Sequence, residues 1–144
     1  MTTTGVADMK KLTKEEREEQ GIIKDPTENV VSMTGPYPYS KEDIVLHVRE
    51  TDVNGNYRTG VLNDKGAFVP KYTGRGLVYD RLCKHLDEGC KDTHFKFRYE
   101  KDELKSYEIE SADYHYFKKQ LRNDIHPRKP DGMDVKITCP YCGN

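Results

Sequence analysis

The stretch Ile137-Thr138-Cys139-Pro140-Tyr141-Cys142-Gly143-Asn144 has a spacing that demands specific chemistry. Two thiols stand two residues apart, a proline follows the first, and a glycine follows the second. A tight turn here points both sulfur atoms to the same side, and Gly143 lets the backbone pass without a Cβ atom. Thiolates at this spacing are typical zinc ligands. The stretch therefore predicts half of a structural zinc site.

The other half must come from elsewhere, because structural zinc takes four protein ligands. We expect Cys90 and His126 to complete the site with Cys139 and Cys142, since each follows the end of a predicted helix. His94 and Cys83 are the alternatives. Cys83 lies within the apolar stripe of a predicted helix, which favours a small buried hydrophobic residue over a ligand. His85 and His115 remain further candidates, and we expect His115 to be partly covered at a helix surface.

The five residues CPYCG, from Cys139 to Gly143, resemble the zinc knuckles of zinc ribbons and related CPxCG proteins. The resemblance implies a zinc-binding turn, covers these five residues only, and identifies no full-length family. His126-Pro127, a short strand and a CxxCG turn are also similar to the zinc-binding end of a small accessory subunit of respiratory complex I. That family has another cysteine just before its histidine, whereas none lies between Cys90 and Cys139 here.

Cys-Pro-Tyr-Cys also resembles the active-site string of glutaredoxins. In that family a helix begins at the motif, and its N-terminal dipole lowers the pKa of the first thiol. Two residues follow Cys142 in this sequence, which is too few for a helix. We therefore prefer a structural metal site to a redox site.

The composition predicts one domain with a modest core, because the chain has 144 residues and 34% of them are hydrophobic. A net charge of -1 favours neither a nucleic-acid-binding nor a membrane-seeking surface. The sequence has no apolar run of about 18 residues and no signal-peptide core. We expect a cytoplasmic or other reducing intracellular compartment, where the four cysteines are thiols or metal ligands.

Residues 1–40 have the composition of an extended, largely disordered arm or linker. Residues 10–20 are rich in charge and could form one exposed helix, with Thr13 and Glu16 as its capping box. This helix has almost no apolar face, so nothing in the pattern attaches it to a core. Three prolines, at positions 26, 36 and 38, then keep the chain extended.

Residues 41–144 are predicted to form a single α+β domain. Ile44, Leu46 and Val48 alternate with Val45, His47 and Arg49, which favours a strand, although Ser40 to Asp43 could instead cap a helix. Asn54-Gly55 is typical of a hairpin turn. Asn63 to Gly66 predicts a further turn, residues 67–72 an edge strand containing Pro70, and residues 76–88 a helix.

A second predicted hairpin pairs residues 95–99 with residues 106–110, with Phe97 opposite Tyr107. In this register Lys96 and Arg98 lie on a solvated face and meet Glu108 and Ser106. A helix over residues 112–125 follows, and residues 135–138 form a last strand that leads to the cysteine pair. The predicted order is β-β-β-α-β-β-α-β, with a mainly antiparallel sheet and two helices.

The sequence lacks the familiar motifs of catalysis, such as Gly-x-Ser-x-Gly or His-Glu-x-x-His. We therefore expect a small non-enzymatic module that binds a protein partner, as an accessory subunit or as a regulator or inhibitor of a larger assembly. One alternative is a nucleic-acid-associated protein that uses basic residues near the cysteine pair. These residues are Lys118, Lys119, Arg122, Arg128 and Lys129. Another alternative is an enzyme whose site is assembled only in space. Backbone amides in Thr73-Gly74-Arg75-Gly76 could also hold an anion.

Overall fold

A four-stranded antiparallel sheet forms the centre of the molecule, with the order β1-β4-β2-β3. The computed structural model describes residues 13–19, 21, 26–132 and 137–143. The strands are β1 (Thr34–Pro38), β2 (Asn54–Leu62), β3 (Phe68–Leu77) and β4 (His94–Tyr99). The helices are α2 (Lys14–Glu19), α3 (Lys41–His47), α4 (Val78–Asp87) and α5 (Glu103–Tyr116), with a 3-10 helix, η1 (Pro26–Asn29). The predicted fold class, α+β with a mainly antiparallel sheet, is confirmed.

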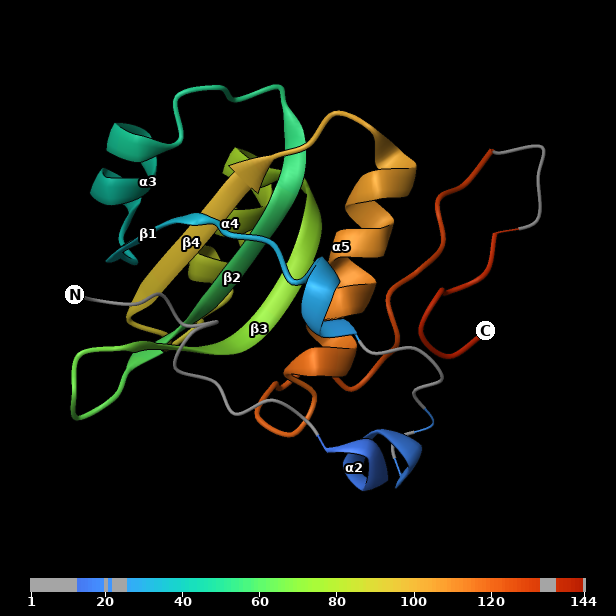
Figure 1. Ribbon diagram of the computed structural model, residues 1–144. Coiled ribbons are helices and arrows are strands. Elements are labelled where there is room, and N and C mark those ends of the chain that lie inside the picture. Colours follow the sequence, from blue (N-terminus) through green and yellow to red (C-terminus); the bar gives the residue numbers. More distant parts are fainter. Residues whose placement is uncertain (1–12, 20, 22–25, 133–136, 144) are drawn as a thin grey trace.

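The two faces of the sheet carry different chemistry, and different helices cover them. Figure 1 shows α4 and α5 on opposite sides of the sheet. Phe95 and Phe97 of β4 pack into an aromatic and aliphatic cluster with Ile44 of α3 and Leu82 of α4. The residue between them, Lys96, points to the other face because side chains alternate along a strand.

Lys96 is not on a solvated face, and that part of the prediction is wrong. Its side chain is only 1% exposed, and its ammonium group lies 5.4 Å from the centre of the Phe68 ring. Gly35 of β1 also lies against it, because a Cβ atom there would come within 3.1 Å of Lys96 Cγ. The predicted alternation is confirmed, since the aromatic side chains of β4 lie on one face of the sheet and Lys96 lies on the other. The sequence pattern could not show that neighbouring segments cover the basic side as well.

Residues 41–47 form helix α3 instead of the first predicted strand. The Ser40 side chain accepts a hydrogen bond from the Asp43 amide at 3.1 Å, so the capping alternative is the one that forms. Ile44 and Val48 are both buried, at the spacing of one helical turn, whereas Leu46 is 56% exposed. Local capping therefore outweighs the β-branched composition of this short segment.

Asn54-Gly55 begins strand β2 and does not form a hairpin turn. The turn between β2 and β3 lies at Asn63 to Gly66, as predicted, and is closed by a 2.9 Å bond from the Gly66 amide to the Asn63 carbonyl. Gly55 is needed because the strands approach closely. A Cβ atom there would lie 2.1 Å from the Arg98 carbonyl oxygen. Strand β3, which contains Pro70, lies at the edge of the sheet.

Helix α5 replaces the predicted strand at residues 106–110 and begins well before the predicted helix at residues 112–125. Asp102 caps it by accepting a 3.1 Å hydrogen bond from the Lys105 amide. Nearly every residue from Ser106 to Tyr116 is buried, so no single apolar stripe marks this helix. No helix in the described part of the chain has the length and apolar character of a membrane span.

The folded domain begins earlier than residue 41. Strand β1 pairs with β4, with Thr34 opposite Phe97, and Tyr39 donates a 2.6 Å hydrogen bond to the Leu82 carbonyl. Strand β1 lies at an edge of the sheet, where prolines are tolerated. The rest of the predicted arm lies partly outside the described residues, as do residues 135 and 136 of the predicted strand at 135–138. Residues 137 and 138 are not in a strand.

A buried ion pair joins α5 to the sheet. Arg58 of β2 donates two hydrogen bonds, of 2.8 and 2.7 Å, to the Asp113 carboxylate of α5. Thr73 of β3 donates a third bond to that carboxylate at 2.9 Å. Arg58 also donates to the Val31 carbonyl, so the same side chain holds the N-terminal segment. These charge-assisted bonds fix the position of α5, and with it the position of the candidate site.

Candidate metal centre

Four side chains with metal-binding atoms converge at the end of α5. They are His115, His126, Cys139 and Cys142, and their donor atoms all lie within 4.8 Å of one another. His115 stands in the last turn of α5, and His126 lies in the loop that follows. The two cysteines come from the knuckle, residues 139–143. In Figure 1 the C-terminal segment passes along the side of α5 that faces away from the sheet. The group could hold a metal ion.

Three distances between these donor atoms match those of a tetrahedral site. His115 Nε2 lies 3.3 Å from His126 Nε2 and 3.5 Å from Cys139 Sγ. Cys142 Sγ lies 3.3 Å from His126 Nε2. An ion with tetrahedral bonds of about 2.0–2.3 Å separates its ligands by about 3.3–3.8 Å. Three of the contacts therefore have the spacing that a single central ion requires, and all four donor atoms lie within 4.8 Å of one another.

The knuckle has the local hydrogen bonds that orient its sulfur atoms. The Tyr141 amide donates to Cys139 Sγ at 3.4 Å, and the Gly143 amide donates to the Cys139 carbonyl at 2.9 Å. Gly143 has a φ of 79°, a conformation that favours glycine. The Tyr141 ring is 1% exposed and packs with Tyr107 and Ala112 of α5. The knuckle is thus docked on the helix that carries His115.

The electrostatic environment suits a cation with neutral imidazole ligands. Burial, with smaller effects from His126 and Lys118, lowers the pKa of His115 to about 4, so its ring is neutral near pH 7. Burial raises the pKa of the Cys139 thiol, and a bound cation would counter this effect by stabilising the thiolate. His126 Nδ1 lies 3.0 Å from the Pro127 carbonyl oxygen. Donation to that oxygen leaves the Nε2 lone pair directed at the other three donors.

Three of the four expected ligands meet in this group, and Cys90 does not. Cys90 Sγ lies 3.7 Å from Arg122 Nη2, beside a separate cavity of about 400 Å³ that Tyr72 and His85 also line. The fourth member of the donor group is His115 and not Cys90. The predicted start of its helix at residue 112 placed His115 in the first turn, far from the loop of His126. A predicted helix that ended at Tyr116 would have placed His115 in its last turn and His126 in the loop that follows.

The alternative ligands also lie elsewhere. Cys83 packs in the cluster between the sheet and helices α3 and α4, with Lys41 Nζ at 3.4 Å from its sulfur. His94 lies beside the Thr93 hydroxyl at 2.9 Å. His85 Nε2 lies 2.7 Å from the Tyr57 hydroxyl.

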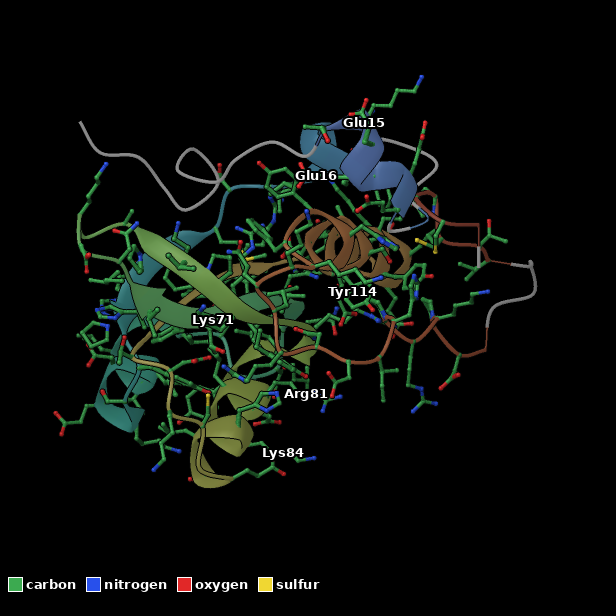
Figure 2. All side chains as sticks on the ribbon, turned by 90° about the horizontal axis from the view of Figure 1, so that it is seen from below. Glu15, Glu16, Lys71, Arg81, Lys84 and Tyr114 are labelled. Carbon is green, nitrogen blue, oxygen red and sulfur yellow. The ribbon has the colours of Figure 1, made fainter. Side chains whose placement is uncertain are left out.

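The basic residues near the knuckle are partly neutralised. Arg122 donates two hydrogen bonds of 2.8 Å to the Asp92 carboxylate. Lys119 forms an ion pair with Glu16, which Figure 2 shows on α2. Two of the five basic residues considered for phosphate binding therefore have carboxylate partners.

Comparison with known proteins found no family model that matches the chain, and no matching curated protein or solved structure.

Proposed function

We propose that the protein binds one zinc ion through His115, His126, Cys139 and Cys142, and that this zinc is structural. The observation that carries the proposal is the convergence of two imidazoles and two thiols, whose donor atoms all lie within 4.8 Å of one another. Zinc favours this donor set and this geometry. Four protein ligands leave no coordination position for a substrate, which is the arrangement of a structural site and not of a catalytic one.

The zinc would fasten the C-terminal segment to α5. The cluster under the knuckle is small, with Tyr107, Ala112, Cys139 and Tyr141 as its buried members. It is separate from the larger cluster between the sheet and helices α3 and α4. A small apolar cluster supplies limited stability, so metal binding would contribute much of the free energy that holds this segment.

In this proposal the protein acts as a small binding module with a protein partner, as an accessory subunit or regulator of a larger assembly. Support comes from exposed apolar side chains beside each other on α3. Val45 is 54% exposed and Leu46 is 56% exposed. By contrast, the buried charges of Arg58 and Asp113 are engaged with each other and are not available to a partner.

The test of the zinc site is metal content together with cobalt spectroscopy. The full chain, purified in the presence of zinc and dialysed, should contain about one zinc per chain by mass spectrometry. Replacement of zinc by Co²⁺ should give the intense visible bands of a tetrahedral site and the charge-transfer bands of thiolate ligands. Substoichiometric zinc, or a cobalt spectrum without thiolate bands, would overturn the proposal.

A further inference from the structure

A groove runs along the outer edge of β3, next to the candidate metal centre. Its volume is about 530 Å³. Gly74, Arg75 and Gly76 of β3 lie along it, and Arg81 of α4 forms part of one wall. The opposite wall comes from the segment 123–131, which contains His126. The candidate metal centre therefore holds one side of this groove.

The backbone of Arg75 faces this groove. Thr73 directs its amide and carbonyl away from β2, because both bond to the Asn123 side chain. In an antiparallel pair, alternate residues direct their backbone groups to the same side. Arg75 stands two residues after Thr73 and therefore also directs its amide and carbonyl outward. Among the described residues, no turn, loop or side chain gives these two groups a hydrogen-bond partner.

Two residues before Arg75, at Thr73, the Asn123 side chain satisfies the backbone hydrogen-bonding groups at this edge of the sheet. Its side-chain amide accepts from the Thr73 amide at 3.0 Å and donates to the Thr73 carbonyl at 2.8 Å. A planar amide thus takes the place of a neighbouring strand at Thr73. The next outward pair along the edge, at Arg75, presents the same donor and acceptor to the groove. A peptide group of another chain has the geometry to satisfy it.

The charges around Arg75 indicate what side chain such a peptide would carry. The Arg75 guanidinium bonds to Glu110 at 2.6 Å, so this pair is neutral. Arg81 packs over Gly76, where a Cβ atom would lie 2.9 Å from Arg81 Nε. Arg81 has no hydrogen-bond or ion-pair contact within the described ranges, and its charge has only a small effect on Glu110, whose pKa is raised by burial. Arg128, Glu103 and Asp131 also line the groove.

We propose that the groove binds an extended peptide of a partner protein, which pairs with the Arg75 backbone and places an acidic side chain beside Arg81. This inference deepens the proposed binding function, and it rests on the metal centre only in that His126 anchors the 123–131 wall. Addition of a strand to an exposed sheet edge is a common mode of peptide recognition. The backbone pair would give affinity, and Arg81 would give selectivity for an acidic residue.

The probe is a library of random linear peptides displayed on phage and selected against the full, zinc-loaded chain. The enriched peptides should contain Asp or Glu within an extended sequence. One of them, synthesised, should bind Arg81→Glu about tenfold more weakly or worse than the wild type. The matched control is Lys84→Glu, on the same helix but absent from the groove lining, and it should stay within about twofold. Figure 2 shows Arg81 and Lys84 together on α4.

A change on the peptide side tests the backbone pairing independently of the protein's stability. N-methylation of single peptide residues should abolish binding at the residue that pairs with Arg75 and should be tolerated at the next residue, whose amide points away. The inference is overturned if no peptide is enriched, if Arg81→Glu and Lys84→Glu bind equally, or if no single N-methylation weakens binding. Displacement by inorganic phosphate alone would show an anion site instead. A dimer that Arg81→Glu dissociates would show that a second copy occupies the groove.

Zinc is measured in the same samples, so the two proposals can fail separately. If the purified chain contains no zinc but binds the peptide in an Arg81-dependent way, the metal proposal is wrong and the groove proposal stands. One zinc per chain without such binding would overturn the groove and keep the metal site.

Discussion

At the scale of single residues, His115 is the side chain on which the candidate metal centre depends and which the sequence pattern did not select. It is 2% exposed, and its Nε2 atom lies within 3.5 Å of both His126 Nε2 and Cys139 Sγ. Its position in the last turn of α5 links the helix to the knuckle. Cys90, which the sequence favoured, lies beside Arg122 in another part of the molecule.

We predict that His115→Ala lowers zinc content from about one per chain to well below it, because three ligands bind far less tightly than four. Cys90→Ser is the matched control and should retain the metal, since its sulfur is outside the donor group. Metal analysis after dialysis against a weak chelator measures both. The ligand assignment would be wrong if Cys90→Ser lost zinc while His115→Ala kept it.

The buried pair Arg58–Asp113 gives a second prediction at this scale. Both side chains are almost fully buried, at 2% and 0% exposure. Asp113→Ala should destabilise the protein by about 3–5 kcal/mol, because it leaves a buried guanidinium without its counter-charge. Urea unfolding of the zinc-loaded chain measures this change. Asp64→Ala, in the exposed turn after β2, should change the free energy of unfolding by less than about 0.5 kcal/mol. Equal effects of the two substitutions would contradict the structural role of the pair.

At the scale of elements, strand β1 is the clearest departure from the expected arm. It covers one edge of β4, and the residues around it are anchored in the core, with Met33 at 5% and Tyr39 at 8% exposure. Without β1, the amides and carbonyls along that edge of β4 would lose their partners. The segment therefore belongs to the domain although its prolines resemble a linker.

We predict that a chain starting at residue 26 unfolds cooperatively, whereas a chain starting at residue 41 does not fold stably. The longer chain keeps β1 and the Val31 carbonyl that accepts from Arg58. The shorter chain also loses the Tyr39 hydrogen bond to Leu82. Near-UV circular dichroism and urea unfolding compare the two. Equal stability of the two chains would show that β1 is dispensable.

At the scale of the whole molecule, two apolar clusters are arranged on different helices. The larger lies between the sheet and helices α3 and α4, and the smaller lies between α5 and the knuckle. Two of the candidate ligands, Cys139 and Cys142, belong to the smaller cluster, so a metal bound there would fasten it. We therefore expect loss of the metal to destabilise the smaller cluster before the larger one.

We predict that removal of zinc by a chelator increases hydrogen exchange in residues 126–132 and 137–143 and leaves β2 and β4 protected. The central strands keep their ladder and the larger cluster, while the knuckle loses the bonds that hold it to α5. Exchange measured by mass spectrometry, with and without chelator, is the test. Restored protection after zinc is added back controls for irreversible damage. Uniform loss of protection would show that the metal stabilises the sheet directly.

Local sequence patterns are sufficient to predict the fold class, the turn at Asn63 to Gly66, the β4 alternation and the knuckle half of the candidate site. Each depends on residues close together in the chain: a turn, a strand period, or two thiols two residues apart. Local information also pointed to the α3 cap at Ser40, although the strand interpretation was preferred. His126 was selected from its place at a predicted helix end.

Tertiary packing determines where α5 lies, that β1 joins the sheet, and which side chain completes the donor group. Helix α5 is covered on nearly all sides, so burial leaves no periodic stripe in its sequence. His115 meets Cys139 across 24 residues, a distance in the chain over which no local spacing rule operates. That contact exists because the buried Asp113 fixes the helix on the sheet and Tyr141 docks the knuckle on the helix. The site is completed by packing, which composition and spacing do not encode.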